Sequence, residues 1–165
     1  MDVPSTPDDK PETVPFTPAD STILVVDDNE PNLELLQAYL AELKCRTLLA
    51  RDGAEAVELF RRESPDLVLL DIMMPRMSGF QVCEAIRADE HDTRTPVIMV
   101  TALNQVADVE RALEAGADDF LTKPVDRLEL LVRVQSQLKI HHLRQELRVA
   151  RAEVARLRDE SAQDS

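Results

Sequence analysis

Cysteine is scarce in this sequence, and the two that occur lie far apart. Cys45 and Cys83 belong neither to a Cys-x-x-Cys pair nor to a histidine-rich cluster, so the ligand spacing of a zinc site is missing. We interpret both as small hydrophobic residues buried in a reducing compartment. His91, His141 and His142 have no Ser, Cys or acidic partner at a recognisable spacing, which argues against a catalytic triad.

The chain also lacks long apolar runs. No stretch approaches the roughly 18 apolar residues that a membrane-spanning helix needs. Residues 1–20 contain five prolines and five acidic residues but no apolar segment of a secretory signal. Because this composition buries little apolar surface, it cannot offset the entropy of ordering. We therefore expect a disordered, acidic and proline-rich tail over residues 1–20, and a cytoplasmic protein without a membrane partner.

Positive charge is in short supply, and the formal net charge is -13 at pH 7. Duplex binding is driven largely by Lys and Arg side chains that neutralise phosphates, so this charge disfavours a nucleic-acid partner. Cations and basic protein surfaces are favoured instead. The carboxyl-terminal region is locally basic but contains no helix-turn-helix or other element that reads DNA; its arginines include Arg133, Arg144, Arg148, Arg151, Arg156 and Arg158.

What the chain does contain is a regular alternation of short apolar runs and helical stretches. Five runs predict strands, at residues 23–26, 47–50, 67–70, 97–100 and 120–121. Between them, apolar residues recur at helical spacing, most clearly at Leu33, Leu36, Leu40 and Leu43 and at Val106, Val109 and Leu113. Strands that alternate with helices predict an α/β fold with a parallel sheet and helices on both faces, because right-handed crossovers place them there.

Helix start and stop signals agree with this pattern. Pro31 suits a first helical turn, and Gly116 is placed to end the fourth helix. Four other positions predict helix starts: Ser78 and Asn104 as caps, and Asp52 with Glu55 and Asp126 with Glu129 as capping boxes.

Polar residues follow four of the five predicted strands. The first run ends in Asp27 and Asp28, the third in Asp71, the fourth in Thr101 and the fifth in Lys123. Taken singly, such residues are as a rule parts of solvated turns or caps. In an open α/β sheet, however, ligands bind outside the carboxyl ends of the strands. Together these residues place three carboxylates, one hydroxyl and one ammonium on a single rim.

This set of groups predicts phosphoryl chemistry with a metal ion. Mg²⁺ is a hard cation that takes oxygen ligands, of which Asp27, Asp28 and Asp71 can supply the protein share. A divalent ion also relieves the repulsion among crowded carboxylates. One carboxylate can then act as a nucleophile, because the metal and Lys123 offset the charge of an incoming phosphoryl group, and Thr101 can hydrogen-bond its oxygens.

Five segments, in this order, resemble the receiver domain of response regulators over residues 22–140. They are 25–29 (Val-Val-Asp-Asp-Asn), 70–75 (Leu-Asp-Ile-Met-Met-Pro), 77–80 (Met-Ser-Gly-Phe), 100–102 (Val-Thr-Ala) and 116–124 (Gly-Ala-Asp-Asp-Phe-Leu-Thr-Lys-Pro). The resemblance implies a flavodoxin-like (βα)5 doubly wound parallel sheet of strand order 2-1-3-4-5. It also implies phosphotransfer onto Asp71 from a histidine kinase or a phosphotransfer protein.

The resemblance further implies a ligand set for Mg²⁺. Asp28 and Asp71 would bind the ion directly, Asp27 would act mainly through water, and the backbone carbonyl of Met73 would complete the protein ligands. Met73 and Leu103 stand where members of the family differ in how long the phosphoryl group survives. Neither side chain can orient an attacking water, so we predict slow self-dephosphorylation.

The resemblance also assigns a conformational switch. Lys123 would pair with the phosphoryl group, and its bond to Pro124 would be cis. The Thr101 hydroxyl would move toward the phosphate while the ring of Phe120 turns inward. From the residues alone, Phe120 would be interpreted as a core residue.

The region after the receiver (residues 21–139) predicts a helical coiled-coil extension over residues 140–165. Neither Gly nor Pro occurs between Pro124 and Ser165. A heptad seam of alternating steps of three and four runs through Ile140, Leu143, Leu147, Ala150, Val154 and Leu157. In a parallel homodimer through residues 140–157, Glu146–Arg151 and Glu153–Arg158 pairs attract, whereas Lys139 and Arg144 repel. The seam is short, so a frayed solvated helix is the alternative.

Three functional hypotheses follow. The first is a two-component response regulator that signals by protein interaction or dimerisation and has no effector enzyme of its own. The second is the regulatory part of a larger effector such as a nucleotide cyclase, phosphodiesterase or hybrid kinase, which the position of the stop codon would reveal. The third is a constitutive coiled-coil scaffold with a vestigial receiver, which failure to label with acetyl phosphate would support.

Overall fold

The structure is a computed structural model that describes residues 15–102 and 106–164. Within these ranges five parallel strands form one sheet in the order β2-β1-β3-β4-β5, as predicted. The strands are β1 Thr22–Val26, β2 Arg46–Ala50, β3 Leu67–Asp71, β4 Val97–Thr101 and β5 Asp119–Thr122. The helices are α1 Glu30–Leu40, α2 Gly53–Glu63, α3 Gly79–Ala88, α4 Val106–Glu114 and α5 Arg127–Gln163, with short 3-10 helices η1 Pro18–Asp20 and η2 Ala41–Leu43.

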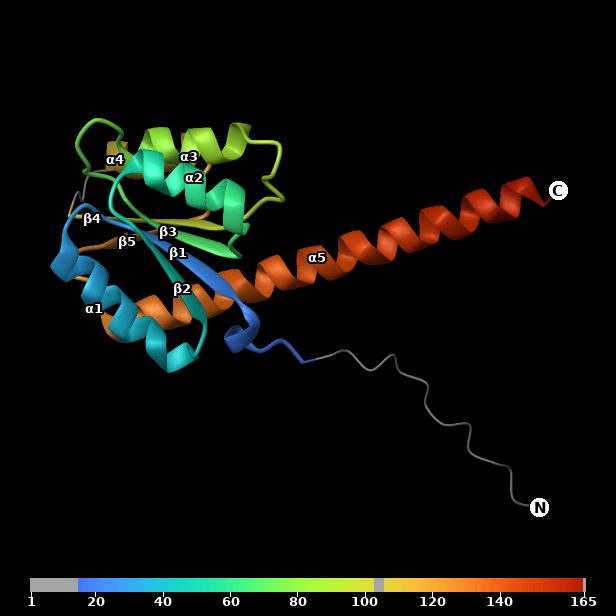
Figure 1. Cartoon of the computed structure of the whole chain (residues 1–165), viewed down its shortest axis with the longest axis horizontal. Coiled ribbons are helices and arrows are strands. Elements are labelled where there is room, and N and C mark those ends of the chain that lie inside the picture. Colours follow the sequence, from blue (N-terminus) through green and yellow to red (C-terminus); the bar gives the residue numbers. More distant parts are fainter. Residues whose placement is uncertain (1–14, 103–105, 165) are drawn as a thin grey trace, which may run out of the picture.

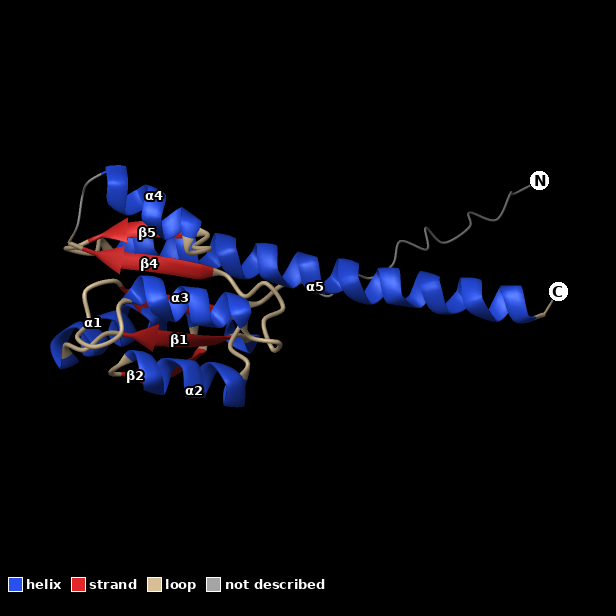
Figure 2. Cartoon of the chain, turned by 90° about the horizontal axis from the view of Figure 1, so that it is seen from above, coloured by secondary structure: helices blue, strands red, loops and turns tan. Residues whose placement is uncertain are grey.

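The sheet is covered on both faces. Helices α2, α3 and α4 lie on one side, and α1 and the first part of α5 lie on the other (Figures 1 and 2). Alternate residues of β1 divide between the two cores: Leu24 and Val26 pack toward α2 and α3, whereas Ile23 and Val25 pack toward α1 and α5. This two-sided burial explains why β1, β3 and β4 are nearly continuous runs of Leu, Val and Ile.

Side-chain caps begin the helices near the predicted positions. Asn29 caps α1, with Pro31 in its first turn. Ser78 and Gln81 form a complete capping box at the start of α3. At Asp52 and Asp126 the acid accepts from the backbone N–H of the predicted glutamate. The reciprocal bond of those two boxes is absent among the described residues; the predicted cap Asn104 lies outside them.

Helix α4 forms where its apolar spacing predicted, but that stripe is not the side it buries. Val106 and Leu113 are 76% and 61% exposed, and Val109 is also exposed. Ala112 is instead the residue of α4 that packs into the core. The spacing therefore identified the helix correctly but not its contact face.

Helix α5 continues well beyond the sheet. Its first part buries Leu130, Leu131, Val134, Leu138 and His141 against the receiver, and the remainder extends away from it as a single straight rod (Figure 1). No helix within the described ranges is both long and apolar enough to cross a membrane.

The structure describes only the last six residues of the expected tail. Residues 1–14 lie outside the described residues. The last part, Pro15–Asp20, lies against the domain: Phe16 packs on the core between the sheet and α1/α5, and Pro18–Asp20 forms η1. The chain therefore contacts the receiver before the predicted start of the domain at residue 21.

Candidate functional site

The carboxyl ends of β1 and β3 bring three carboxylates together. Asp27 and Asp28 directly follow β1, and Asp71 is the last residue of β3. One carboxylate oxygen from each lies within 4.8 Å of the others. Asp27 and Asp71 are buried, whereas Asp28 is exposed. A cluster of this kind offers oxygen ligands from two buried groups and one that faces solvent, which suits a cation that keeps some of its water.

Lys123 lies within this cluster. Its ammonium is 3.1 Å from Asp27 Oδ2 and 3.5 Å from Asp71 Oδ1. The backbone N–H of Lys123 donates to the carbonyl of Thr101 over 2.8 Å, which ties the end of β5 to the end of β4. The predicted cis bond between Lys123 and Pro124 is present. The four separated stretches of chain thus meet at one rim of the sheet.

The electrostatics of the cluster are dominated by burial of negative charge. Burial, and then the neighbouring charge of Asp27, raise the pKa of Asp71 to about 6. Lys123 and the backbone N–H of Met73 act in the opposite direction but do not compensate fully. One ammonium therefore serves two buried carboxylates, and the rim has a deficit of positive charge.

The start of α1 orients the first carboxylate. The backbone N–H of Asn29 donates to Asp27 Oδ1 over 2.9 Å, while the other oxygen of Asp27 faces Lys123. Asn29 also caps α1 through its side chain, which accepts from the N–H of Asn32. Each oxygen of the Asp27 carboxylate therefore accepts a hydrogen bond, one from the Asn29 N–H at the start of α1 and one from the Lys123 ammonium, and these bonds fix its orientation.

The predicted switch residues lie on one side of the sheet. Thr101 pairs with Thr122 in the β4–β5 ladder, two residues after Phe120, so Thr101 and Phe120 share a face. Thr101 is fully buried, and Phe120 is partly buried against the core on the α2 and α3 side. Two residues after Asp71, Met73 is 63% exposed. Leu103, its counterpart in the lifetime prediction, lies outside the described residues.

Gly79 has a role at the site that the sequence did not reveal. A Cβ atom at this position would collide with the carbonyl oxygen of Asp71 and stand 2.7 Å from the Cα of Ile72. The N–H of Gly79 donates to the Ile72 carbonyl over 2.9 Å. The start of α3 therefore closes directly onto the backbone of Asp71 and Ile72. Gly79 belongs to a segment that matched the receiver motif, but close backbone approach can be seen only in three dimensions.

Comparison with known proteins is consistent with this geometry. A profile of the response regulator receiver domain matches residues 23–135. The response regulator PleD of Caulobacter vibrioides is 42% identical over 135 residues, which cover 82% of this chain and 30% of PleD. The DNA-binding dual master transcriptional regulator RpaA of a Synechocystis strain is 39% identical over 117 residues, covering 71% of this chain and 48% of RpaA.

A solved structure shares the same fold. The receiver domain of the sensor histidine kinase PA1611 from Pseudomonas aeruginosa, with a magnesium ion coordinated in its active-site cleft, superposes with a TM-score of 0.68 at 36% identity. The alignment covers 73% of this chain and 98% of that domain. The present chain therefore spans a whole receiver domain but less than half of either curated relative.

Proposed function

This chain belongs to the response regulator receiver family, and on that premise we propose that it accepts a phosphoryl group on Asp71 in two-component signalling. The observation that carries the proposal is the position of Asp71. Its carboxylate is buried at the end of β3, 3.5 Å from the Lys123 ammonium, in a cluster with too little positive charge. A divalent cation bound by these carboxylates and the Lys123 ammonium would together offset the negative charge of a transferred phosphoryl group.

The transfer requires one bond to form and one to break. An Asp71 carboxylate oxygen attacks the phosphorus of a phosphohistidine on the donor, a histidine kinase or a phosphotransfer protein. The new O–P bond forms as the P–N bond breaks, and the imidazole leaves with the electron pair and takes up a proton. Such a step needs mainly in-line positioning and charge stabilisation. Lys123 supplies a positive charge beside the acceptor, and the Thr101 hydroxyl supplies a hydrogen bond once the group is in place.

The residues present fit a Mg²⁺ ion. We assign Asp28 and Asp71 as direct ligands, Asp27 as a ligand mainly through water, and the Met73 carbonyl as the last protein ligand. The closeness of the three carboxylates supports this set, as does the bond of Asp27 to Lys123, which leaves Asp27 less available for direct coordination. When bound, the ion supplies positive charge that stabilises the transferred phosphoryl group.

The switch would couple the acceptor to the face of β4 and β5. Attraction of the Thr101 hydroxyl toward phospho-Asp71 would vacate space beside Phe120, which lies on the same side of the sheet. The partial burial of Phe120 supports this role, because a ring that is neither fully packed nor fully solvated has room to turn inward.

Slow self-dephosphorylation is part of the proposal. The Met73 side chain is exposed beside the acceptor but carries no group that can orient a water molecule. We expect phospho-Asp71 to persist for minutes in buffer with Mg²⁺, measured by mass spectrometry after the donor is removed. Loss of the label within seconds would contradict this expectation. In this proposal the receiver acts as a signalling domain.

An apolar groove beside the acceptor supports a protein donor. It lies between α1 and the loop that joins β5 to α5, and it is lined by Asn32, Leu35, Leu36, Tyr39, Lys123, Pro124 and Val125. Leu35 is 45% exposed. A partner helix that filled this groove would stand next to the phosphorylation site.

A parallel homodimer through residues 140–157 is the output that the extension supports. Of the residues that pack on the receiver, Leu131, Val134, Leu138 and His141 occupy heptad positions b and f when Ile140 is placed at a, and Leu130 occupies position e. The seam occupies a and d, on the opposite side of the same helix, and its large side chains are exposed: Ile140, Leu143, Leu147, Val154 and Leu157. The receiver therefore does not obstruct the seam.

In this arrangement residues 1–20 form a tail, 21–139 the receiver and 140–165 the coiled-coil extension. Because the chain spans 30% of PleD, the alternative is a regulatory portion of a larger effector. The reading frame beyond Ser165 discriminates between the two. The extension balances five arginines with five acidic residues, so its charge favours neither a nucleic-acid nor a membrane partner.

Labelling of the full chain tests the acceptor. Acetyl phosphate with Mg²⁺ should add one phosphoryl group to the wild type and none to Asp71→Asn. Asp28→Asn keeps the acceptor but loses a ligand, so it should label only at higher Mg²⁺ concentration. Peptide mapping that placed the label elsewhere, or no labelling of a folded wild type, would overturn the proposal and support a vestigial receiver. Light scattering with and without beryllofluoride then shows whether phosphorylation changes the mass.

A further inference from the structure

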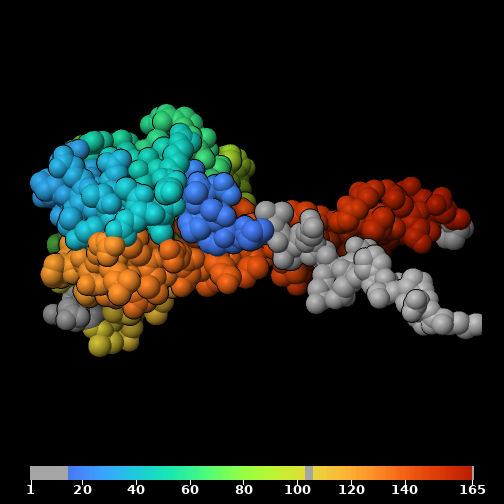
Figure 3. All heavy atoms as spheres, turned by 90° about the horizontal axis from the view of Figure 1, so that it is seen from below, coloured from blue at the N-terminus to red at the C-terminus, as the bar shows by residue number. Residues whose placement is uncertain are grey.

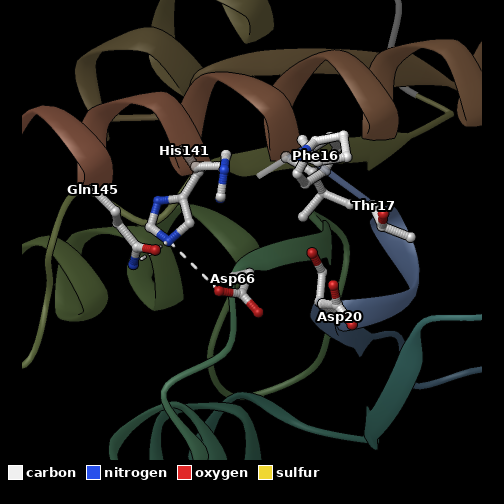
Figure 4. Close-up of a pocket in the computed structure, with 10 residues that line it drawn as sticks. Phe16, Thr17, Asp20, Asp66, His141 and Gln145 are labelled. Carbon is white, nitrogen blue, oxygen red and sulfur yellow. Dashed lines mark hydrogen bonds and ion pairs between the residues drawn. The ribbon is translucent and has the colours of Figure 1, made fainter. Parts of the chain in front are cut away.

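The junction between the receiver and the extension contains a buried histidine with an incomplete set of partners. His141 is 3% exposed and is the last buried residue of α5. Its Nε2 accepts from the side-chain amide of Gln145 over 3.0 Å and lies 3.7 Å from Asp66 Oδ1 (Figure 4). Its Nδ1 has no hydrogen-bond partner among the described residues. A neutral ring that accepts at Nε2 carries its proton on this unpartnered Nδ1.

A strap formed by Pro15–Ser21 closes over this histidine. The strap approaches α5 beside the start of the extension (Figure 3), and the Phe16 ring packs against that of His142 with centroids 5.3 Å apart. A cavity of about 160 Å³ remains between the strap and the helix, and Asp66 and His141 are among its lining residues (Figure 4). Water can therefore reach the junction with little rearrangement.

The same junction fixes the first strand. Asp66 Oδ2 accepts from the backbone N–H of Thr22 over 2.8 Å, while Oδ1 faces His141. Further along the helix, Arg148 donates to the Thr93 carbonyl over 3.1 Å. Asp66 thus joins the start of β1 to His141, and the strap lines the same cavity as that imidazole.

Charged groups of both signs surround this imidazole. Asp66, before β3, and Asp92, between α3 and β4, favour its protonated form, whereas Arg144 and Arg148 of α5 oppose it. Asp20 of the strap and His142 of α5 also line the cavity. Burial outweighs the carboxylates, so the pKa of His141 is lowered from its ordinary value.

We propose that His141 is an acid-sensitive latch, which holds the strap and the first turns of the extension to the receiver while neutral and releases them when protonated. A proton on Nε2 removes the acceptor of the Gln145 bond and places a charge in a site built for a neutral ring. Because the proton binds more tightly to the open form, the latch is intact above the ordinary histidine pKa and weakens as the pH falls below it. The proposal requires neither phosphorylation nor dimerisation.

Hydrogen exchange of the full chain tests the latch. Amide opening in residues 15–21 and 138–148 is compared at about pH 7.5 and about pH 5.5, after correction for the intrinsic exchange rate. In the wild type the opening constant of these segments should rise by up to about tenfold on acidification, because one proton is taken up, while β1 and β3 stay protected. His141→Gln should lose the rise because the amide does not titrate. His91→Gln, a control at an exposed histidine outside the cavity, should keep it.

A second readout covers the case in which His141→Gln is open at both pH values. NMR titration of the wild-type His141 ring should give a midpoint below the ordinary histidine value, in the range where the junction opens. A midpoint at or above the ordinary value, or the same acid-induced opening in a folded His141→Gln variant, overturns the latch.

Discussion

The Lys123 ammonium lies 3.1 Å from Asp27 Oδ2 and 3.5 Å from Asp71 Oδ1. One cation therefore balances two buried carboxylates, and the pKa of Asp71 stays raised, at about 6. This imbalance is the physical reason why the rim suits a divalent cation, whose charge can then offset that of a phosphoryl group. It also means that Lys123 and the metal compete for the same negative charge.

Substitution of Lys123 should strengthen Mg²⁺ binding but slow phosphoryl transfer. In Lys123→Met, binding of Mg²⁺ should tighten in calorimetry, because no side-chain cation competes for the carboxylates. The rate of labelling by acetyl phosphate should fall roughly a hundredfold, because one stabilising group for the transferred charge is lost. Lys139→Met, a substitution of an exposed lysine on α5, is the control and should change neither value. Labelling of Lys123→Met at the wild-type rate would show that Lys123 does not assist the transfer.

The raised pKa of Asp71 predicts a pH dependence of stability without metal. Because the folded-state pKa of about 6 lies above the ordinary value of 3.8, the protonated form is favoured by folding. Its contribution is complete below the ordinary value and is lost as the pH rises through about 6. In EDTA, the unfolding free energy of wild type relative to Asp71→Asn should fall by roughly 1–3 kcal/mol from pH 4 to pH 7. A flat difference across this range in urea titrations would contradict the assignment.

Much of the fold could be predicted because buried parallel strands have a strong sequence signature. The run of Leu67 to Leu70 is apolar on both faces, and the acid that follows it stands at the sheet edge. Parallel strands also align their carboxyl ends, so the meeting of Asp27, Asp71 and Lys123 could be anticipated from strand order. The role of each residue within the cluster, by contrast, was inferred from the resemblance to receiver domains.

What could not be predicted depends on contacts between distant segments. His141 has no acidic neighbour in sequence, yet the fold places it 3.7 Å from Asp66. Phe16 belongs to a stretch whose composition indicated disorder, but its ring finds an apolar surface on α5. The spacing of Val106 and Leu113 could not show that Ala112 would be the buried side of α4, because the contact face depends on what lies beneath the helix.

Substitution of Gly79 should damage the acceptor site through the backbone. An added methyl group would meet the backbone of Asp71 and Ile72, which is fixed by the β3–β4 ladder. We expect Gly79→Ala to cost about 1–3 kcal/mol in urea unfolding and to slow labelling of Asp71. Gly53→Ala provides the comparison, because its methyl group would meet Cβ, Cγ and Sδ of Met77, in a loop, and not the backbone of Asp71. A loss of stability with normal labelling is expected there, and equal slowing of labelling at both glycines would contradict the role of the close approach to Asp71.

The extension offers a matched pair of apolar residues for testing the dimer. Leu147 lies at seam position a and is 50% exposed, whereas Val149 lies off the seam and is 70% exposed. Leu147→Glu places two like charges at the proposed interface and removes two apolar side chains, so dimer dissociation should increase by roughly a hundredfold in sedimentation or light scattering. Val149→Glu carries the same change in charge and should remain as dimeric as the wild type. Both variants should still label on Asp71, because their substitutions lie beyond the receiver. A monomeric wild type, or equal dissociation of the two variants, would exclude the seam as the contact and leave the solvated helix as the state of the extension.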